Sequence, residues 1–143
     1  MIEMSVVFPN GPGGSREPLV VTGRQGSGDL VYVVYTDPAH VAFGFDHWGG
    51  GGVVGQPVAV DYGRAHRVSV TLQSLYPAES PAHASTRVRV ALDGVAALEG
   101  NSPCYPAGAE HIFVGRNPIG GSTCGQAFNG RIVTVERPPI PPP

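Results

Sequence analysis

Apolar and polar residues alternate along most of the chain, and no stretch sustains the spacing of a helix. The segments HRVSVTLQ (66–73) and RVRVALDG (87–94) each place valines and a leucine on one face and mainly polar residues on the other. This period of two is that of a strand with one buried face. The segment LVYVVYT (30–36) is apolar on both faces, which is typical of a central strand between two layers. About eight to ten short strands are predicted in this way.

The segment HVAFGFD (40–46) has an unusual second face. One side carries a valine and two phenylalanines, whereas the other carries only Ala42 and Gly44. A glycine inside a strand often marks the close approach of another group. We therefore expect a neighbouring segment to pack tightly against this face.

Turn-forming residues separate the predicted strands. Asp93-Gly94 is a strong signal for a tight hairpin, and Asp37-Pro38 marks a second one. The final segment PPIPPP (138–143) cannot join a sheet, because proline donates no backbone hydrogen bond, and it is predicted to be a Pro-rich tail or linker. The pattern over residues 1–137 predicts an all-β fold, a two-sheet antiparallel β-sandwich of the jelly-roll type.

Composition narrows the range of partners. Only 14% of the 143 residues are charged, the formal net charge is −2, and all nine basic residues are arginine. No basic face is implied, so nucleic acid and anionic membranes are not expected as partners. No run approaches the ~18 apolar residues of a membrane-spanning helix. The first residues, MIEMSVVF, lack the basic and apolar regions of a signal peptide.

Four segments occur in an order that resembles laminin-G-like domains of the concanavalin-A-like lectin/glucanase superfamily. They are HRVSVTL, RVRVALDGV, EHIFVGRN and CGQAFNGRIVTV, and the last contains the family's pattern at Phe128, Gly130 and Ile132. The resemblance covers roughly residues 3–137. It implies a two-sheet jelly roll that binds glycans, extracellular matrix or partner proteins, in an extracytoplasmic, multidomain protein.

The two cysteines, Cys104 and Cys124, lie in turns on either side of the predicted strand EHIFVG. A disulfide between them would close a loop of about 20 residues and stabilise the fold by roughly 3 kcal/mol. Two unpaired thiols are the alternative. The placement of both cysteines in loops and the expected extracytoplasmic location favour the bridge. In the family that the sequence resembles, one half of a disulfide often lies near the position of Cys124.

The sequence carries no motif for catalysis. Glycoside hydrolases need two carboxylates beside the scissile bond, and no predicted strand carries two acids at such spacing. The Lys and Gln-x-His of related lyases and the G-x-S-x-G of serine hydrolases are also missing. The five histidines are spaced too widely to suggest a transition-metal site. We therefore do not expect an enzyme.

Trp48 is the best candidate for a ligand contact, because it follows a predicted strand end and precedes four consecutive glycines (49–52). A sugar could stack on its ring while nearby polar groups satisfy hydroxyls. The full candidate set is Trp48, Asp46, His47, Tyr76, Tyr105 and Asn117. The alternative, which we favour, is that Trp48 folds back to cap the core. The glycines either pass close to another backbone, form a moving lid or are tolerated slack.

No cofactor is required by these patterns, although some family members bind calcium at the sandwich rim. Asp46, Asp61 and Asn117 are the candidate calcium ligands, because calcium prefers oxygen donors from loops. Arg64, Arg67, Arg87 and Arg89 form a predicted outer ladder, which is either a solvated face or a contact for an acidic glycan. The leading hypothesis is a non-catalytic carbohydrate-binding module. The alternative is a structural or adhesive domain that contacts other proteins, including copies of itself, through its edge strands.

Overall fold

Eleven strands and three short 3-10 helices make up the regular structure of residues 1–10 and 13–138, the part of the chain that the computed structural model describes. The first sheet contains five strands, in the order β11 (Arg131–Glu136), β1 (Ile2–Val7), β7 (His66–Thr71), β8 (Arg87–Leu92) and β9 (Val95–Asn101). The second contains six, β10 (Ile112–Val114), β2 (Arg16–Arg24), β3 (Ser27–Asp37), β4 (His40–His47) and β5 (Gly51–Val54), with β6 (Val58–Ala59) also pairing with β4. The 3-10 helices are η1 (Gln73–Leu75), η2 (Pro81–Ala84) and η3 (Ala109–His111).

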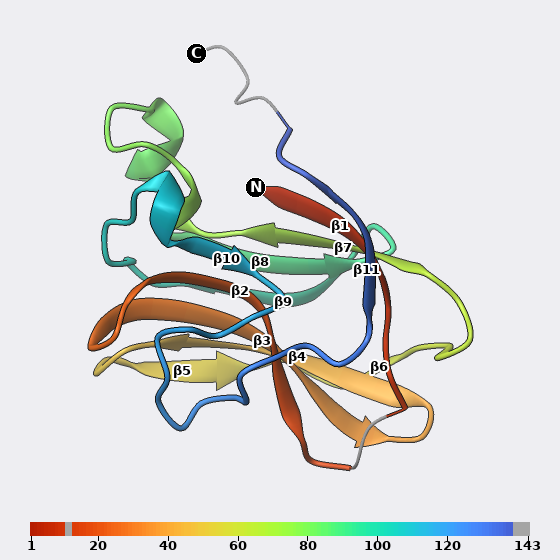
Figure 1. Ribbon diagram of the computed structural model, residues 1–143. Coiled ribbons are helices and arrows are strands. Elements are labelled where there is room, and N and C mark those ends of the chain that lie inside the picture. Colours follow the sequence, from red (N-terminus) through yellow and green to blue (C-terminus); the bar gives the residue numbers. More distant parts are fainter. Residues whose placement is uncertain (11–12, 139–143) are drawn as a thin grey trace.

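Every pair of neighbouring strands is antiparallel. The two sheets stack face to face, with β1, β7, β8 and β9 in one layer and β2, β3, β4 and β5 in the other (Figure 1). The predicted all-β, two-sheet antiparallel sandwich is therefore confirmed. Of the predicted Pro-rich tail at 138–143, only Pro138 belongs to the described residues, so the tail stays a prediction.

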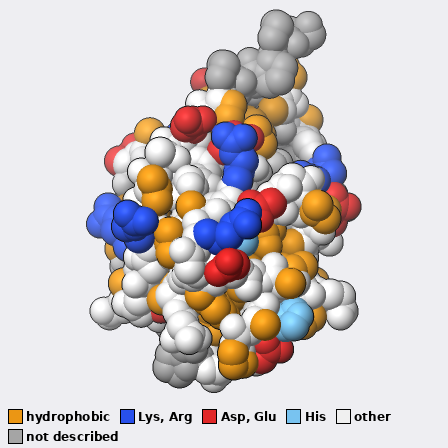
Figure 2. All heavy atoms as spheres, turned by 90° about the vertical axis from the view of Figure 1, so that its right-hand side faces the viewer, with side chains coloured by type: hydrophobic (Ala, Val, Ile, Leu, Met, Phe, Trp, Pro, Cys, Tyr) orange, Lys and Arg blue, Asp and Glu red, His pale blue; other side chains and the backbone are white. Residues whose placement is uncertain are grey.

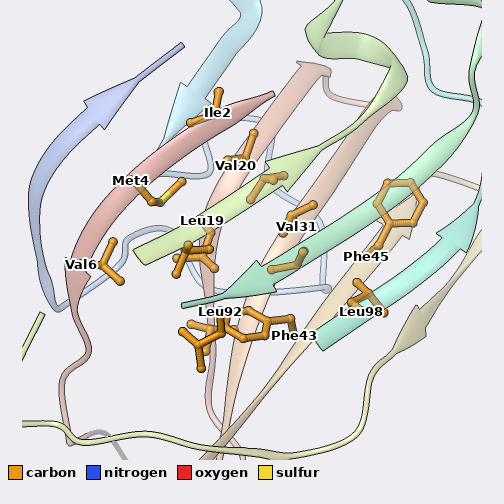
Figure 3. Close-up of a cluster of buried hydrophobic side chains, with 14 of the residues drawn as sticks. Ile2, Met4, Val6, Leu19, Val20, Val31, Phe43, Phe45, Leu92 and Leu98 are labelled. Atoms are coloured by element: carbon orange, nitrogen blue, oxygen red, sulfur yellow. The ribbon is translucent and has the colours of Figure 1, made fainter. Parts of the chain in front are cut away.

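The inner faces of the two sheets meet in one hydrophobic core (Figure 3). Val68 and Val70 of β7 are fully buried there, and Phe43 and Phe45 of β4 face them from the other sheet. These are the residues that the period-two pattern assigns to the buried face. Each such side chain contributes roughly 1.5–3 kcal/mol when it leaves water, so the core accounts for much of the stability of the sandwich.

The close contact expected at Gly44 is provided by Tyr32. A Cβ atom added to Gly44 would lie 2.2 Å from Cζ of the Tyr32 ring. The two residues are register partners on β3 and β4, and the Tyr32 side chain points to the outer face of the sheet, across Gly44. Gly44 thus lets the tyrosine ring lie flat across β4.

Two strands differ from the expectation drawn from sequence. The glycine run begins an edge strand, β5, instead of forming only a loop, because its last two glycines pair with Asp46 and His47 of β4. The segment VAALEGN forms β9, although a bulge opposite Val90 and Ala91 interrupts its alternation. Both are edge strands, whose weaker patterns reflect burial on one side only.

The described residues contain no helix that is long and apolar enough to span a bilayer. The predicted arginine ladder is largely paired with acids: Arg87 and Arg89 lie 3.0 Å and 3.1 Å from Glu99, and Arg67 lies 3.7 Å from Glu3. Acidic and basic side chains are also interspersed on the face shown in Figure 2. The solvated-face interpretation of the ladder therefore fits the structure better than an uninterrupted basic patch.

Candidate binding site on the outer face of the six-stranded sheet

The turn between β4 and β5 explains each of the four consecutive glycines. Gly49 and Gly51 have φ angles of 78° and 85°, a backbone conformation that residues with a side chain rarely adopt. A Cβ on Gly50 would lie 2.6 Å from the His47 ring, and one on Gly52 would lie 2.2 Å from the Phe45 carbonyl oxygen. The run is therefore a tight, crowded turn and not tolerated slack.

Trp48 packs on the outside of the six-stranded sheet, away from the main core. It is half-buried against a second apolar cluster of Val21, Leu30 and Ile119. Its ring also lies against Gly121, where an added Cβ would be 3.1 Å away. The residue neither caps the main core nor stands free in solvent, so the inward orientation expected from sequence is only partly realised.

The hollow beside this ring has a volume of about 240 Å³, and we call it the Trp48 hollow. Its walls are Asp46, Trp48, Gly49, Gly121, Ser122 and Thr123. The Thr123 hydroxyl donates a hydrogen bond to the Asp46 carboxylate, which fixes the acid at the junction of sheet and loop. An indole ring, a carboxylate and two hydroxyls thus border one opening.

A second hollow, of about 370 Å³, adjoins the first and shares Asp46, Ser122 and Thr123 with it. We call it the Arg16 hollow. The Arg16 guanidinium lies over the Tyr32 ring, 5.3 Å from its centroid, and donates to the Tyr32 hydroxyl at 3.4 Å. The other walls of the Arg16 hollow are Gly52, Val53 and Val54 of β5. The outer face of the sheet therefore carries a groove with one aromatic and one cationic end.

A buried polar group holds the turn that carries Trp48. The Asp29 carboxylate is fully buried, and its Oδ1 lies 2.5 Å from Nδ1 of His47. The amide of Tyr105 donates to the other carboxylate oxygen at 2.8 Å, and the Tyr105 ring stacks on His47 at 4.4 Å. The Tyr105 hydroxyl donates to the Trp48 carbonyl at 2.7 Å. Burial raises the pKa of Asp29, while the bonds from His47 and Tyr105 oppose that rise.

The structure thus gathers Asp46, His47, Trp48 and Tyr105 through direct contacts. Asn117 is buried close by, in the segment that leads to Gly121, and its side-chain amide donates to the Gly120 carbonyl at 3.1 Å. Tyr76 lies elsewhere, in a separate hollow beside Pro77 and Ile112. The sequence-based set is therefore divided between two places on the surface.

Each of the three candidate calcium ligands accepts a hydrogen bond from a different neighbour. Asn117 Oδ1 accepts from the Gly120 amide at 3.2 Å, and Asp46 is bonded to Thr123. Asp61 accepts from the Gly63 amide at 2.8 Å, in a turn where its carbonyl meets His66. The described residues contain no group of three or more acidic, histidine or cysteine side chains that could hold a metal ion. Calcium binding by Asp46, Asp61 and Asn117 stays a prediction.

The two cysteines are both free thiols, so the expected disulfide is not seen. Cys104 packs against the main core, whereas Cys124 packs against the second cluster beside Trp48. Burial raises the pKa of each thiol to about 11, and the nearby Asp29 adds to the rise at Cys104. Because thiolate is the reactive form, neither side chain is activated as a nucleophile at neutral pH.

Arg16, Tyr32, Ser122 and Thr123 were not anticipated from the sequence. The single signal for Tyr32 was the face of segment 40–46 that carries only Ala42 and Gly44, where a closely packed neighbour was expected. The hydroxyl pair lies in a segment, residues 115–130, that crosses the outer face, where the Gly125 amide donates to the Arg16 carbonyl at 3.0 Å. No local pattern in GGSTCGQ specifies that crossing.

The two stacked sheets define a jelly-roll domain, and the groove on the outside of the six-stranded sheet is its candidate binding site. No family model matches the sequence, and no curated protein matches it. Among solved structures, mouse laminin alpha1 chain, domains LG4-5, is similar, with a TM-score of 0.56 and 13% identity over 94% of this chain and 34% of that one. The chain thus spans about a third of the length of that structure. The likeness supports the laminin-G-like fold predicted from the sequence.

Proposed function

We propose that the protein is a non-catalytic, extracytoplasmic binding module that holds carbohydrate in the Trp48 hollow. The observation that carries the proposal is the meeting of the Trp48 ring, the Asp46 carboxylate and the Ser122 and Thr123 hydroxyls around one opening. Binding sites typically combine an apolar wall with a few fixed polar groups, which is what a sugar ring with one apolar face requires. The laminin-G-like fold supports a binding role over catalysis.

The polar side of the hollow is held in place before any ligand arrives. Asp46 is fixed by Thr123, and the Trp48 backbone is fixed by the Gly28 carbonyl at 2.9 Å and the Tyr105 hydroxyl at 2.7 Å. A site whose groups are already ordered loses less conformational entropy on binding. The rigid turn therefore supports recognition of a small, weakly charged ligand such as a neutral sugar.

The proposal is tested by a glycan array followed by titration calorimetry on the best binders. We expect Trp48→Ala to weaken binding by about fivefold or more, because aromatic stacking contributes roughly 1 kcal/mol or more. The matched control is Tyr76→Ala, which removes another half-buried ring from the separate hollow and should leave the affinity unchanged. Equal losses in both variants, with intact folding by circular dichroism, would place the sugar elsewhere. Wild-type protein that binds no glycan would refute the proposal.

Calcium is the only ion that the resemblance suggests, and the same titration tests it. Because Asp46, Asp61 and Asn117 are bonded in different surroundings, we expect the affinity to be the same in calcium and in excess chelator. A loss of binding in chelator that calcium restores would instead show a metal-dependent site.

The adhesive alternative is also supported by a specific observation. Val53, Val54, Val133 and Val135 on edge strands are all exposed by 43–49% of their surface. Exposed valines on strand edges favour contacts with other polypeptide chains.

A further inference from the structure

The edge strand β5 carries unused backbone hydrogen-bonding groups. In the described part of the chain it pairs with β4 on one side and with no strand on the other. The Gly55 amide donates to the Phe43 carbonyl at 2.8 Å. Because bonded and non-bonded pairs alternate in an antiparallel ladder, the amide and carbonyl of Val54 and Gly52 point away from β4. They form a template onto which another strand can add.

An apolar hollow of about 450 Å³ lies between β5 and β9, the edges of the two sheets, and we call it the edge hollow. Val53, Val58, Ala97 and Leu98 are among its walls. The one charged wall residue, Glu99, is bonded to Arg87 and Arg89 on β8. On this side of β5, an added strand would meet an apolar surface with no unpaired charge.

The Arg16 hollow lies against the other side of β5. Because Gly44 has no side chain, the Tyr32 ring extends over β4 toward Val54, the register partner of Gly44. The Arg16 guanidinium lies over that ring and donates a hydrogen bond to the Tyr32 hydroxyl. Arg16 is exposed and makes no ion pair with the residues that the structure describes. The carboxylate in the same hollow, Asp46, already accepts a bond from Thr123.

Strand β11 has the side chains that these two surfaces require. It is the edge of the five-stranded sheet, and among the strands of the described residues it pairs only with β1. Val133 and Val135 are exposed by 49% and 45%, and they alternate with Thr134 and Glu136. Glu136 is exposed and, among residues 1–10 and 13–138, has no ion-pair partner. A shift of the register with β1 at Val133 interrupts the alternation, and beyond it Val135 pairs with Met4 whereas Thr134 and Glu136 pair with Ser5 and Glu3. Successive side chains point to opposite faces, so β11 presents Val135 on one face and polar or acidic groups on the other.

We propose that β5 of one molecule pairs with β11 of a second copy, which joins the six-stranded sheet of the first to the five-stranded sheet of the second. Val135 of β11 enters the edge hollow, and Glu136, on the opposite face, reaches Arg16. Because β5 and β11 are different edges, the contact is heterologous. It leaves β11 of the first copy and β5 of the second free for further copies, so the molecules associate head to tail. This inference does not depend on sugar binding in the Trp48 hollow.

Sedimentation velocity over a range of concentrations tests the association. We expect wild type to grow beyond a dimer as concentration rises, and Val54→Pro to shift the midpoint to about tenfold higher concentration, because it removes one outward amide donor. Proline is tolerated on the solvent side of an edge strand, so the ladder with β4 is preserved. The matched control, Val54→Thr, keeps the amide and should assemble like wild type. A strictly monomeric wild type, or a Val54→Pro variant that assembles like wild type, overturns the proposal.

A charge exchange tests the partners themselves. Arg16→Glu and Glu136→Arg should each reduce self-association, since each places like charges opposite one another at the joint. A mixture of the two variants should restore both kinds of joint, one between Glu at position 16 and Arg at position 136 and one between the unchanged Arg16 and Glu136. The mixture should therefore assemble head to tail as alternating copies. If the mixture associates no better than either variant alone, or if wild type stops at a symmetric dimer, the β5–β11 contact is wrong. Urea denaturation of each variant separates these outcomes from unfolding.

Discussion

His66 and Asp93 connect the start of β7 to the hairpin between β8 and β9. His66 is buried, and its Nδ1 lies 2.7 Å from Asp93 Oδ2, while its Nε2 lies 3.0 Å from the Asp61 carbonyl. The Arg67 amide donates to the other Asp93 oxygen at 2.9 Å. Asp93 and Gly94 have φ angles of 50° and 84°, which fits a two-residue turn of type I′. The Asp93 side chain, which lies in the turn, thus also holds the start of β7 through His66 and the Arg67 amide.

These contacts predict how stability depends on pH. Burial alone would raise the pKa of Asp93, but the bonds from His66 and the Arg67 amide outweigh it and hold the pKa below the usual 3.8. A depressed pKa in the folded state means that ionised Asp93 adds stability above 3.8, which is lost as pH falls through the lower folded value. We expect the free energy of unfolding in urea to fall less steeply with acid in Asp93→Asn than in wild type. Parallel curves would contradict this role.

Asparagine is the suitable replacement, because it tolerates the left-handed conformation of the turn. Any difference between the two proteins near neutral pH therefore reports the lost charge-assisted bonds and not a broken hairpin.

At the scale of elements, the β4–β5 turn depends on a neighbour that is distant in the sequence. Tyr105 stacks on His47 and bonds to the Trp48 carbonyl, although it lies 57 residues beyond Trp48. We expect Tyr105→Phe to keep the stack, to lose about 1 kcal/mol of stability, and to speed amide exchange in the turn. Hydrogen exchange followed by NMR measures this effect.

Tyr62→Phe is the control for that variant. It removes a hydroxyl that donates to the Asp37 carbonyl at 3.1 Å, at a different hairpin. Exchange at Trp48 and the glycines that follow it should not respond. If both variants speed that exchange equally, the bond from Tyr105 does not hold the turn.

The elements that could be predicted from sequence are those whose signal is local. The alternation in β7 and β8, the Asp93-Gly94 hairpin and the small residue at Gly44 each follow from a few adjacent positions. The glycine run was ambiguous, because its crowding comes from His47 and Phe45 folded against it. The placement of Trp48 was ambiguous for the same reason: its support, Ile119, belongs to a segment far along the chain. Contacts of this kind have no local signature.

At the scale of the whole molecule, Glu17 links the two sheets. It is buried on β2 of the six-stranded sheet, where the Tyr35 hydroxyl donates to it at 2.5 Å. The side-chain amide of Asn129, two residues before β11 of the five-stranded sheet, donates to its other oxygen. Burial, and then the bond to Glu17, raise the pKa of Tyr35 well above its usual range. The tyrosine therefore stays a donor at all ordinary pH values.

This arrangement fixes the path of segment 115–130, which carries Ser122 and Thr123 across the outer face. We expect Glu17→Gln to cost roughly 1–3 kcal/mol, because its NH2 group takes the place of one carboxylate oxygen and faces the side-chain amide of Asn129, which is a donor. The double variant Glu17→Gln with Asn129→Asp should recover part of that loss, since the new carboxylate can accept from the new amide. Chemical denaturation measures the stabilities, and NMR shifts of Ser122 and Thr123 report the segment. A single variant as stable as wild type, with unchanged shifts, would mean that other contacts, such as the packing of Ile119 and Trp48, hold the segment in place.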